Sequence, residues 1–160
     1  MPKPDPNLAV TISLLDRLID LNPEETVDPP AGRSQSIRQL KASLRRDLEW
    51  LLNTRRTPDA APPSYEELYR SLYNYGLPDV TSMALSSPRD RQRLMRLIEE
   101  CINIFEPRLA EVRVRMLDYT GSRVLRFQIE ALLKIDPAPE QVLFDTVLQL
   151  NSGEYQVSGE

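Results

Sequence analysis

The chain has no histidine and a single cysteine, Cys101, among its 160 residues. Internal disulfides and the Ser-His or Cys-His arrangements of nucleophilic catalysis are therefore excluded, as are zinc sites built from Cys and His ligands. Glycine is scarce, with five residues. Gly121 and Gly153 stand alone in expected turns, so no glycine-rich loop can cradle a phosphate. We expect no metal and no cofactor.

Long apolar runs are also missing, and the longest falls far short of the ~18 to 20 residues that cross a bilayer. The first seven residues carry a cation but no apolar segment behind it, unlike a secretory signal. With 28% charged and 41% hydrophobic residues, the composition is that of an ordinary globular protein. We therefore expect a cytoplasmic protein without membrane insertion.

Charge is unevenly distributed along the chain. Residues 33–56 hold seven cations and two anions, whereas residues 136–160 hold five anions and no cation. Such asymmetry bears on partners and on orientation in an assembly, and it says little about the fold.

The first 35 residues are expected to form an arm. After prolines at positions 2, 4 and 6, apolar residues recur with helical spacing and predict a short amphipathic helix over 8–21, carrying Leu8, Ile12, Leu15, Leu18 and Ile19. A proline-containing linker follows it. A helix this short is marginal by itself, so we expect it to order against a neighbour.

Two helices are predicted to open with capping boxes. Ser36 and Gln39 would start a helix over 36–54, and Ser64 with Glu67 would start a shorter one that ends near Gly76. A third helix should begin at Ser87, with proline in its first turn, and end before Pro107. Cys101 falls on its apolar stripe, where a buried thiol is expected.

After Pro107 the apolar period changes from 3.6 to 2. Alternation over 112–116, 124–135, 142–150 and 155–157 predicts strands. The expected fold class is α+β, with N-terminal helices packed on one face of a C-terminal antiparallel β-meander in a domain spanning 36–160.

Two chemical alternatives remain open. A glycosidase needs two carboxylates about 5 to 9.5 Å apart, and the helix and corner before the sheet offer Glu99, Glu100, Glu106 and Glu111. A basic helix face could instead bind phosphates, through Arg38, Lys41, Arg45 and Arg46. Asp47 and Glu49 interrupt that face, and the sequence pI near 5.0 opposes nucleic-acid binding.

Glu106, Pro107 and Arg108 form an unusual corner where the last helix gives way to the sheet. One interpretation is a helix stop with two solvated charges. The other is a rigid plug for another protein, in which Arg108 offers forked hydrogen bonds to carboxylates or carbonyls.

Several motifs in order resemble the TssE family, the type VI secretion baseplate subunits of the phage baseplate-wedge, lysozyme-like superfamily. They are Arg46-Asp-Leu-Glu-Trp-Leu-Leu-Asn-Thr-Arg55, Ser71-Leu-Tyr-Asn-Tyr-Gly-Leu-Pro-Asp79, Phe105-Glu-Pro-Arg-Leu109, Phe127-Gln-Ile-Glu-Ala-Leu-Leu133, Phe144-Asp-Thr146 and Ser152-Gly-Glu154. The resemblance covers residues 36–158 and leaves the first 35 outside it.

The resemblance implies a structural, non-enzymatic subunit that joins the TssF–TssG wedge and TssK. It also implies that Glu106, Pro107 and Arg108 anchor the subunit to the wedge. The TssB–TssC sheath is a further expected partner, with the VgrG–Hcp spike and tube hub as another candidate.

We expect the sheath to pair with a free edge of the sheet. The residues chosen for sheath binding are Arg126, Gln128, Glu130, Tyr155 and Val157.

Overall fold

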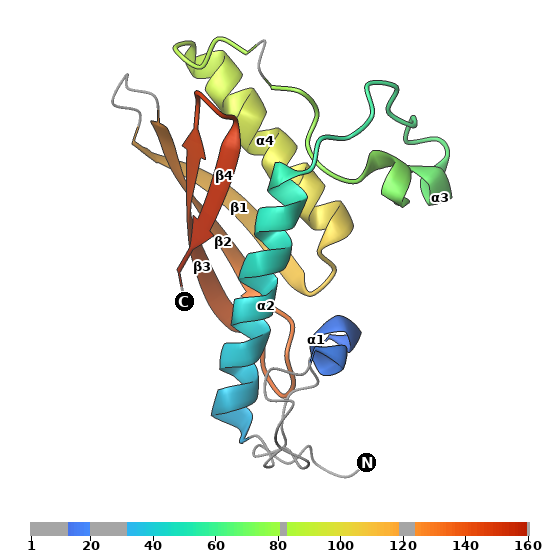
Figure 1. Ribbon diagram of the computed structural model, residues 1–160, viewed down its shortest axis with the longest axis vertical. Coiled ribbons are helices and arrows are strands. Elements are labelled where there is room, and N and C mark those ends of the chain that lie inside the picture. Colours follow the sequence, from blue (N-terminus) through green and yellow to red (C-terminus); the bar gives the residue numbers. More distant parts are fainter. Residues whose placement is uncertain (1–12, 20–31, 81–82, 119–123, 160) are drawn as a thin grey trace.

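The computed structural model describes residues 13–19, 32–80, 83–118 and 124–159 (Figure 1). Helices precede strands along the chain. The elements are α1 (Leu14–Leu18), α2 (Arg33–Asn53), α3 (Glu66–Tyr69), the 3-10 helix η1 (Leu72–Asn74), α4 (Pro88–Phe105), β1 (Leu109–Asp118), β2 (Val124–Leu133), β3 (Glu140–Gln149) and β4 (Glu154–Ser158). None of the described helices is both long and apolar enough to cross a membrane.

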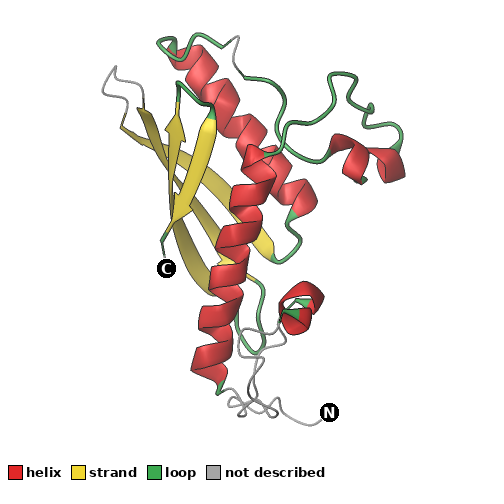
Figure 2. Ribbon diagram, viewed as in Figure 1, coloured by secondary structure: helices red, strands yellow, loops and turns green. Residues whose placement is uncertain are grey.

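The four strands form one antiparallel sheet in the order β1-β2-β3-β4. Helices α2 and α4 lie on one of its faces, α2 against β4 and α4 against β1 (Figure 2). The predicted α+β fold, with helices on one face of a meander, is confirmed.

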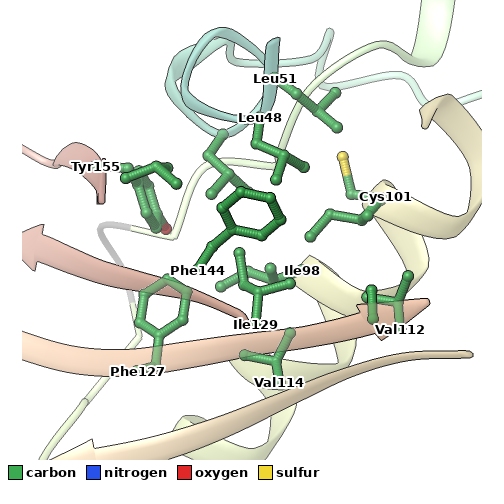
Figure 3. Packing of buried hydrophobic residues seen from close by; sticks show 14 of the residues in the cluster. Leu48, Leu51, Ile98, Cys101, Val112, Val114, Phe127, Ile129, Phe144 and Tyr155 are labelled. Atoms are coloured by element: carbon green, nitrogen blue, oxygen red, sulfur yellow. The ribbon is translucent and has the colours of Figure 1, made fainter. Parts of the chain in front are cut away.

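Alternation along each strand builds the core, because successive side chains point to opposite faces of a sheet. On β2 the side chains of Leu125, Phe127 and Ile129 are fully buried, whereas that of Arg126 is exposed. The inward side chains meet the apolar stripes of α2 and α4. Figure 3 shows this cluster, with Leu48 and Leu51 of α2, Ile98 and Cys101 of α4, Val112 and Val114 of β1, Ile129 of β2 and Phe144 of β3.

Helix α2 begins three residues before the expected Ser36. Its N-cap is Gly32, whose carbonyl accepts hydrogen bonds from the backbone N–H and the hydroxyl of Ser36, each at 3.0 Å. Ser36 is buried inside the first turn, so the prediction that it caps the helix was wrong. The start of α4 at Ser87 and Pro88, and its end at Glu106, are confirmed.

The segment between α2 and α4 also differs from the prediction. Helix α3 has Tyr65 rather than Ser64 at its N-cap, without a side-chain cap. Order comes instead from Asn74, which is buried, accepts from the backbone N–H of Ala61 at 2.9 Å and donates to the carbonyl of Tyr69 at 3.1 Å. The hydrogen bonds of the Asn74 side chain stabilise this segment, which projects from the body of the molecule (Figure 1).

Gly76 lets that loop return against the end of α2. Its φ is +99°, and a Cβ at this position would lie 2.2 Å from the carbonyl oxygen of Thr54. Only glycine combines this backbone conformation with so close an approach.

Helix α1 covers only part of the predicted helix over 8–21, and residues 8–12 and 20–21 lie outside the described part of the chain. The Ser13 hydroxyl caps it by accepting from Asp16 N–H at 3.2 Å. None of its residues is buried, and Leu14 and Leu18 are exposed by 71% and 74%. The described members of the predicted apolar face, Leu15, Leu18 and Ile19, are therefore all exposed.

Candidate functional site

The corner between α4 and β1 is closed by an ion pair within the motif itself. Arg108 donates from Nε to Glu106 Oε1 at 2.6 Å and from Nη2 to Glu106 Oε2 at 2.5 Å. The Glu106 side chain is 7% exposed and that of Arg108 is 25% exposed. Two parallel bonds between a guanidinium and a carboxylate are strong and directional, so they hold the corner on both sides of Pro107.

A residue distant in sequence completes the corner. Arg108 Nη2 also lies 2.6 Å from Asp47 Oδ2 on α2. The other oxygen of Asp47 accepts from Arg46 Nη2 at 2.9 Å, and Arg46 Nη1 in turn lies 2.8 Å from Asp16 on α1. We call these five residues the charge chain. It joins the N-terminal arm, α2 and the corner with charges of alternating sign.

The electrostatics of the charge chain favour the ionised forms of Arg108, Arg46 and Asp16. The hydrogen bonds with Glu106, followed by those with Asp47, raise the pKa of Arg108 despite its burial. The pKa of Arg46 is raised chiefly by its bond to Asp47. Burial acts to raise the pKa of Asp16, but the bonds from Ser13 and Arg46 outweigh it and lower that pKa below the usual range.

The three predicted wedge-binding residues lie together in the structure, but their charged groups bind within the chain. The forked donors of Arg108, expected to reach another protein, are bound to Glu106 and Asp47 within the chain. What remains accessible is Pro107, which is exposed, and a quarter of the Arg108 side chain. The Pro107 carbonyl also accepts from Lys134 Nζ at 2.9 Å. The corner is thus a fixed projection with its charges already paired.

Sequence reasoning missed two residues of α2, one that belongs to the charge chain and one that contacts it. Asp47 was noted only as an interruption of a basic face, and nothing local shows that it meets Arg108, 61 residues away. Trp50 is 54% exposed, and the guanidinium carbon of Arg46 lies 5.0 Å from its ring centroid. Tryptophan and arginine side chains often dominate protein interfaces. The single tryptophan could therefore have been marked from the sequence as a candidate contact.

The five predicted sheath-binding residues do not share one edge of the sheet. Arg126, Gln128 and Glu130 lie on β2, which is paired on both sides, so their backbone groups cannot accept another strand. Their side chains lie on the sheet face away from the helices, where Gln128 donates to Asp145 at 2.8 Å and Glu130 lies 3.3 Å from Arg115.

Tyr155 and Val157 do lie on an edge strand, but α2 covers that edge. Asn53 accepts from Tyr155 N–H at 2.9 Å and donates to the Tyr155 carbonyl at 2.8 Å. Glu49 accepts from Val157 N–H at 3.1 Å. Both strand side chains are buried, at 4% and 6% exposed. Helix side chains thus occupy the backbone groups that a free edge would offer.

The opposite edge, formed by β1, is more open. Glu99 on α4 accepts from Val114 N–H at 2.7 Å. Both of these residues line a groove of about 420 Å³ between α4 and β1, together with Met95, Arg96 and Met116. Met116 is 39% exposed. This groove lies directly beside the strand edge.

Three of the four carboxylates considered for hydrolysis are engaged in structural contacts. Glu99 bonds to Val114, Glu106 pairs with Arg108, and Glu100 accepts from the Tyr69 hydroxyl. Glu111 sits at a positive φ of 52° in an irregular stretch of β1. In the described residues, no group of three or more acids or cysteines could hold a metal ion.

The basic helix face is partly neutralised within the chain. Lys41 lies 2.8 Å from Glu140, and Arg46 is paired with Asp16 and Asp47. Arg38 and Arg45 are exposed. The face therefore offers fewer free cations than the sequence suggested.

Comparison with known proteins adds a family match. The model of the family described as baseplate wedge protein gp25 matches residues 38–138, more than half of the chain. No curated protein matches significantly. Among solved structures, a chain of the baseplate complex from the type VI secretion system aligns with a TM-score of 0.47 and 22% identity, covering 68% of this chain and 93% of that chain.

Proposed function

The chain belongs to the baseplate wedge protein gp25 family, and from this premise we propose that it is the type VI secretion baseplate subunit on which the contractile sheath begins to assemble. Membership makes it a structural component of a baseplate. The type VI assignment is supported by the ordered motifs that resemble the TssE family, which include the charged corner.

The charged corner is the proposed attachment to the TssF–TssG wedge. The observation that carries this proposal is the internal pairing of Arg108 with Glu106 and Asp47, which fixes the geometry of an exposed Pro107. A preorganised surface loses little conformational freedom on binding. Trp50 lies on the same helix as Asp47 and is the proposed apolar contact next to this corner.

The sheet is the proposed contact for the TssB–TssC sheath, because an edge strand presents backbone groups that an extended chain can satisfy. Arg126, Gln128 and Glu130 would contribute through side chains on the outer face alone. Pairing at Tyr155 and Val157 would first require the side chains of α2 to move away.

The remaining partners follow from the same proposal. TssK completes the wedge, and the VgrG–Hcp hub is a further candidate at the centre of such an assembly. The subunit would act in the cytoplasm, at a baseplate docked to the membrane through other proteins, without binding nucleic acid. Residues 1–35 would form an arm to the baseplate domain over 36–160, to which it is joined by the start of α2 at Arg33 and by the ion pair of Asp16 with Arg46. A structural role also agrees with carboxylates that are engaged in internal contacts.

Co-purification with TssF and TssG tests the assignment. We expect the wild-type chain to be retained by the wedge, and Arg108→Ala or Glu106→Ala to weaken binding at least about tenfold, because each variant loses the internal ion pair that fixes the geometry of Pro107. Arg113→Ala, on the exposed face of β1, serves as the control and should bind normally. Circular dichroism of each variant checks that it is folded.

Two outcomes would contradict the proposal. One is a wild-type chain that does not associate with the wedge proteins. The other is a folded corner variant that binds them as tightly as the wild type does.

A further inference from the structure

We infer that α1 is an anchor helix, whose exposed Leu14 and Leu18 enter an apolar groove of the wedge proteins beside the charged corner. This inference deepens the proposed function and rests on it, since the wedge is the proposed partner of that corner. The helix lies outside residues 38–138, which match the family model. Family membership therefore implies nothing about α1, and the inference depends on the structure alone.

Helix α1 is turned the opposite way from an ordinary surface helix. Such a helix packs its apolar side on the core and leaves its polar side in water. In α1 the residue that faces the body of the molecule is Asp16, whose side chain is 15% exposed and lies 2.8 Å from Arg46 on α2. Asp16 also faces the Ser43 hydroxyl of α2. A charged side chain, and no buried apolar one, thus fixes how α1 lies on α2.

The most exposed leucines lie on the other side of α1. Each residue of an α-helix turns by about 100°, so the positions two before and two after Asp16 point away from it. These positions are Leu14 and Leu18, which are 71% and 74% exposed, and the flanking Leu15 and Ile19 are 47% and 44% exposed. A contiguous apolar surface that is held outward is typical of a contact for another molecule.

The spacing of these side chains suits entry into a groove. An amphipathic helix binds an apolar groove through anchors three or four residues apart, and Leu14 and Leu18 form such a pair. A helix as short as α1 is marginal by itself. The Ser13 cap and the ion pair of Asp16 hold it in place before binding, and a preorganised contact loses less conformational freedom when it binds.

The charge chain places α1 next to the corner, which identifies the wedge as the occupant. It runs from Asp16 to Arg108 through two residues of α2, with contacts of 2.8, 2.9 and 2.6 Å (Figure 1). Trp50 is 54% exposed and lies under the guanidinium of Arg46, so it adds apolar surface to the same region. A partner that holds Pro107 can therefore also reach the leucines of α1.

The charge of the arm argues against a membrane surface as the occupant. Helices that lie on membranes carry Lys and Arg on their polar face and are attracted to anionic lipids. The first 35 residues instead hold six anions and three cations, and within α1 the charge of Arg17 is balanced by that of Asp16. An anionic surface would repel this arm, whereas an apolar protein groove would not.

Binding of the full chain to the purified TssF–TssG wedge tests the inference. We expect the double variant Leu14→Ser with Leu18→Ser to bind at least about tenfold more weakly than the wild type, because two apolar side chains are no longer removed from water. Leu143→Ser is the matched control and should bind normally, since Leu143 is a 41% exposed leucine on the sheet face away from the helices. Circular dichroism checks that each variant is folded.

Two further measurements test the position of α1. Asp16→Ala keeps both leucines but removes the ion pair with Arg46, so it should weaken wedge binding by about threefold through lost preorganisation. The photoreactive residue p-benzoylphenylalanine, placed at position 18, should crosslink to TssF or TssG when the complex is irradiated. The same residue at position 143 should not.

The outcomes separate this inference from the proposed function. If the leucine double variant binds the wedge as tightly as the wild type while Arg108→Ala binds weakly, the proposed function stands and α1 is no anchor. A wild-type chain that does not bind the wedge would remove both.

Two other results would assign the leucines to a different occupant and so overturn the inference. One is sedimentation of the wild type as a dimer that the leucine double variant does not form. The other is wild-type binding to vesicles of phosphatidylcholine and phosphatidylglycerol that the same variant loses.

Discussion

At the scale of single residues, the charge chain is a structural feature as well as a candidate contact. Arg108 bonds to Glu106 and Asp47 at once, and the Glu106 side chain is almost fully buried. A buried carboxylate is tolerated when it is paired, and becomes costly when its partner is removed.

We therefore predict that Arg108→Ala lowers the free energy of unfolding by about 3 kcal/mol, because it leaves Glu106 buried without a cation. Asp47→Ala should cost less, since the bidentate bond to Glu106 remains. Urea denaturation measures both, with the exposed Arg45→Ala as a control expected within about 0.5 kcal/mol of the wild type. A loss at Arg108 no larger than at Arg45 would show that the pairing adds nothing to the fold.

The single thiol gives a prediction on pH. Burial raises the pKa of Cys101 to about 12, compared with ~8.5 in an unfolded chain. The folded state thus holds the proton more tightly, so this contribution to stability is full below pH ~8.5 and is lost as the pH rises toward 12. Between these limits the wild type should lose up to ~1.4 kcal/mol per pH unit relative to Cys101→Ala.

Urea titrations of both proteins from pH 7 to pH 10 measure that difference directly. Other titrating groups cancel because the two chains share them. Parallel curves across this range would mean that the thiol is not buried in the folded protein.

Residue-scale prediction from the sequence was sound for what is local. Glu106, Pro107 and Arg108 are adjacent, so their proximity needed no fold, and the apolar stripe correctly placed Cys101 in the core. Asp47 could not be identified as a partner because its contact with Arg108 depends on how α2 packs against the corner.

At the scale of elements, side chains of the helices decide which strand edges are open. Asn53 at the end of α2 bonds to both backbone groups of Tyr155 and so takes the place of a neighbouring strand. Covering an edge in this way protects it from unwanted pairing.

Replacing Asn53 with leucine should uncover the β4 edge. We expect hydrogen exchange at Tyr155 N–H to accelerate by about tenfold, and stability to fall by about 1 kcal/mol as these bonds are lost to water. Asn103→Leu is the control, because the Asn103 side chain donates to the carbonyl of Glu99 in its own helix. Exchange at Tyr155 that matches the wild-type rate would show that Asn53 does not protect the edge.

The strands could be predicted because each has one buried and one exposed face, which gives a clear period of two, as in β2. The starts of two helices could not be predicted from the sequence. The spacing of Ser36 and Gln39 is compatible with a cap or with an interior turn, and the preceding Gly32 provided the cap. The difference between the two edges depends on Asn53, Glu49 and Glu99 reaching strands distant in sequence.

At the scale of the whole molecule, the charged corner and the groove beside β1 lie at opposite ends of this strand. The corner precedes the strand at Arg108, whereas the groove borders its later part at Met116. A single subunit of the baseplate wedge protein gp25 family can therefore be held by one neighbour and still offer its sheet to another.

A cryo-electron microscopy reconstruction of the baseplate bearing its first sheath ring tests this account most directly. It should show the corner at Pro107 buried against the wedge, and an extended segment of the first sheath ring paired with an edge strand of the sheet. An assembled baseplate and sheath in which Pro107 faces solvent, or in which neither edge of the sheet contacts the sheath, would contradict it.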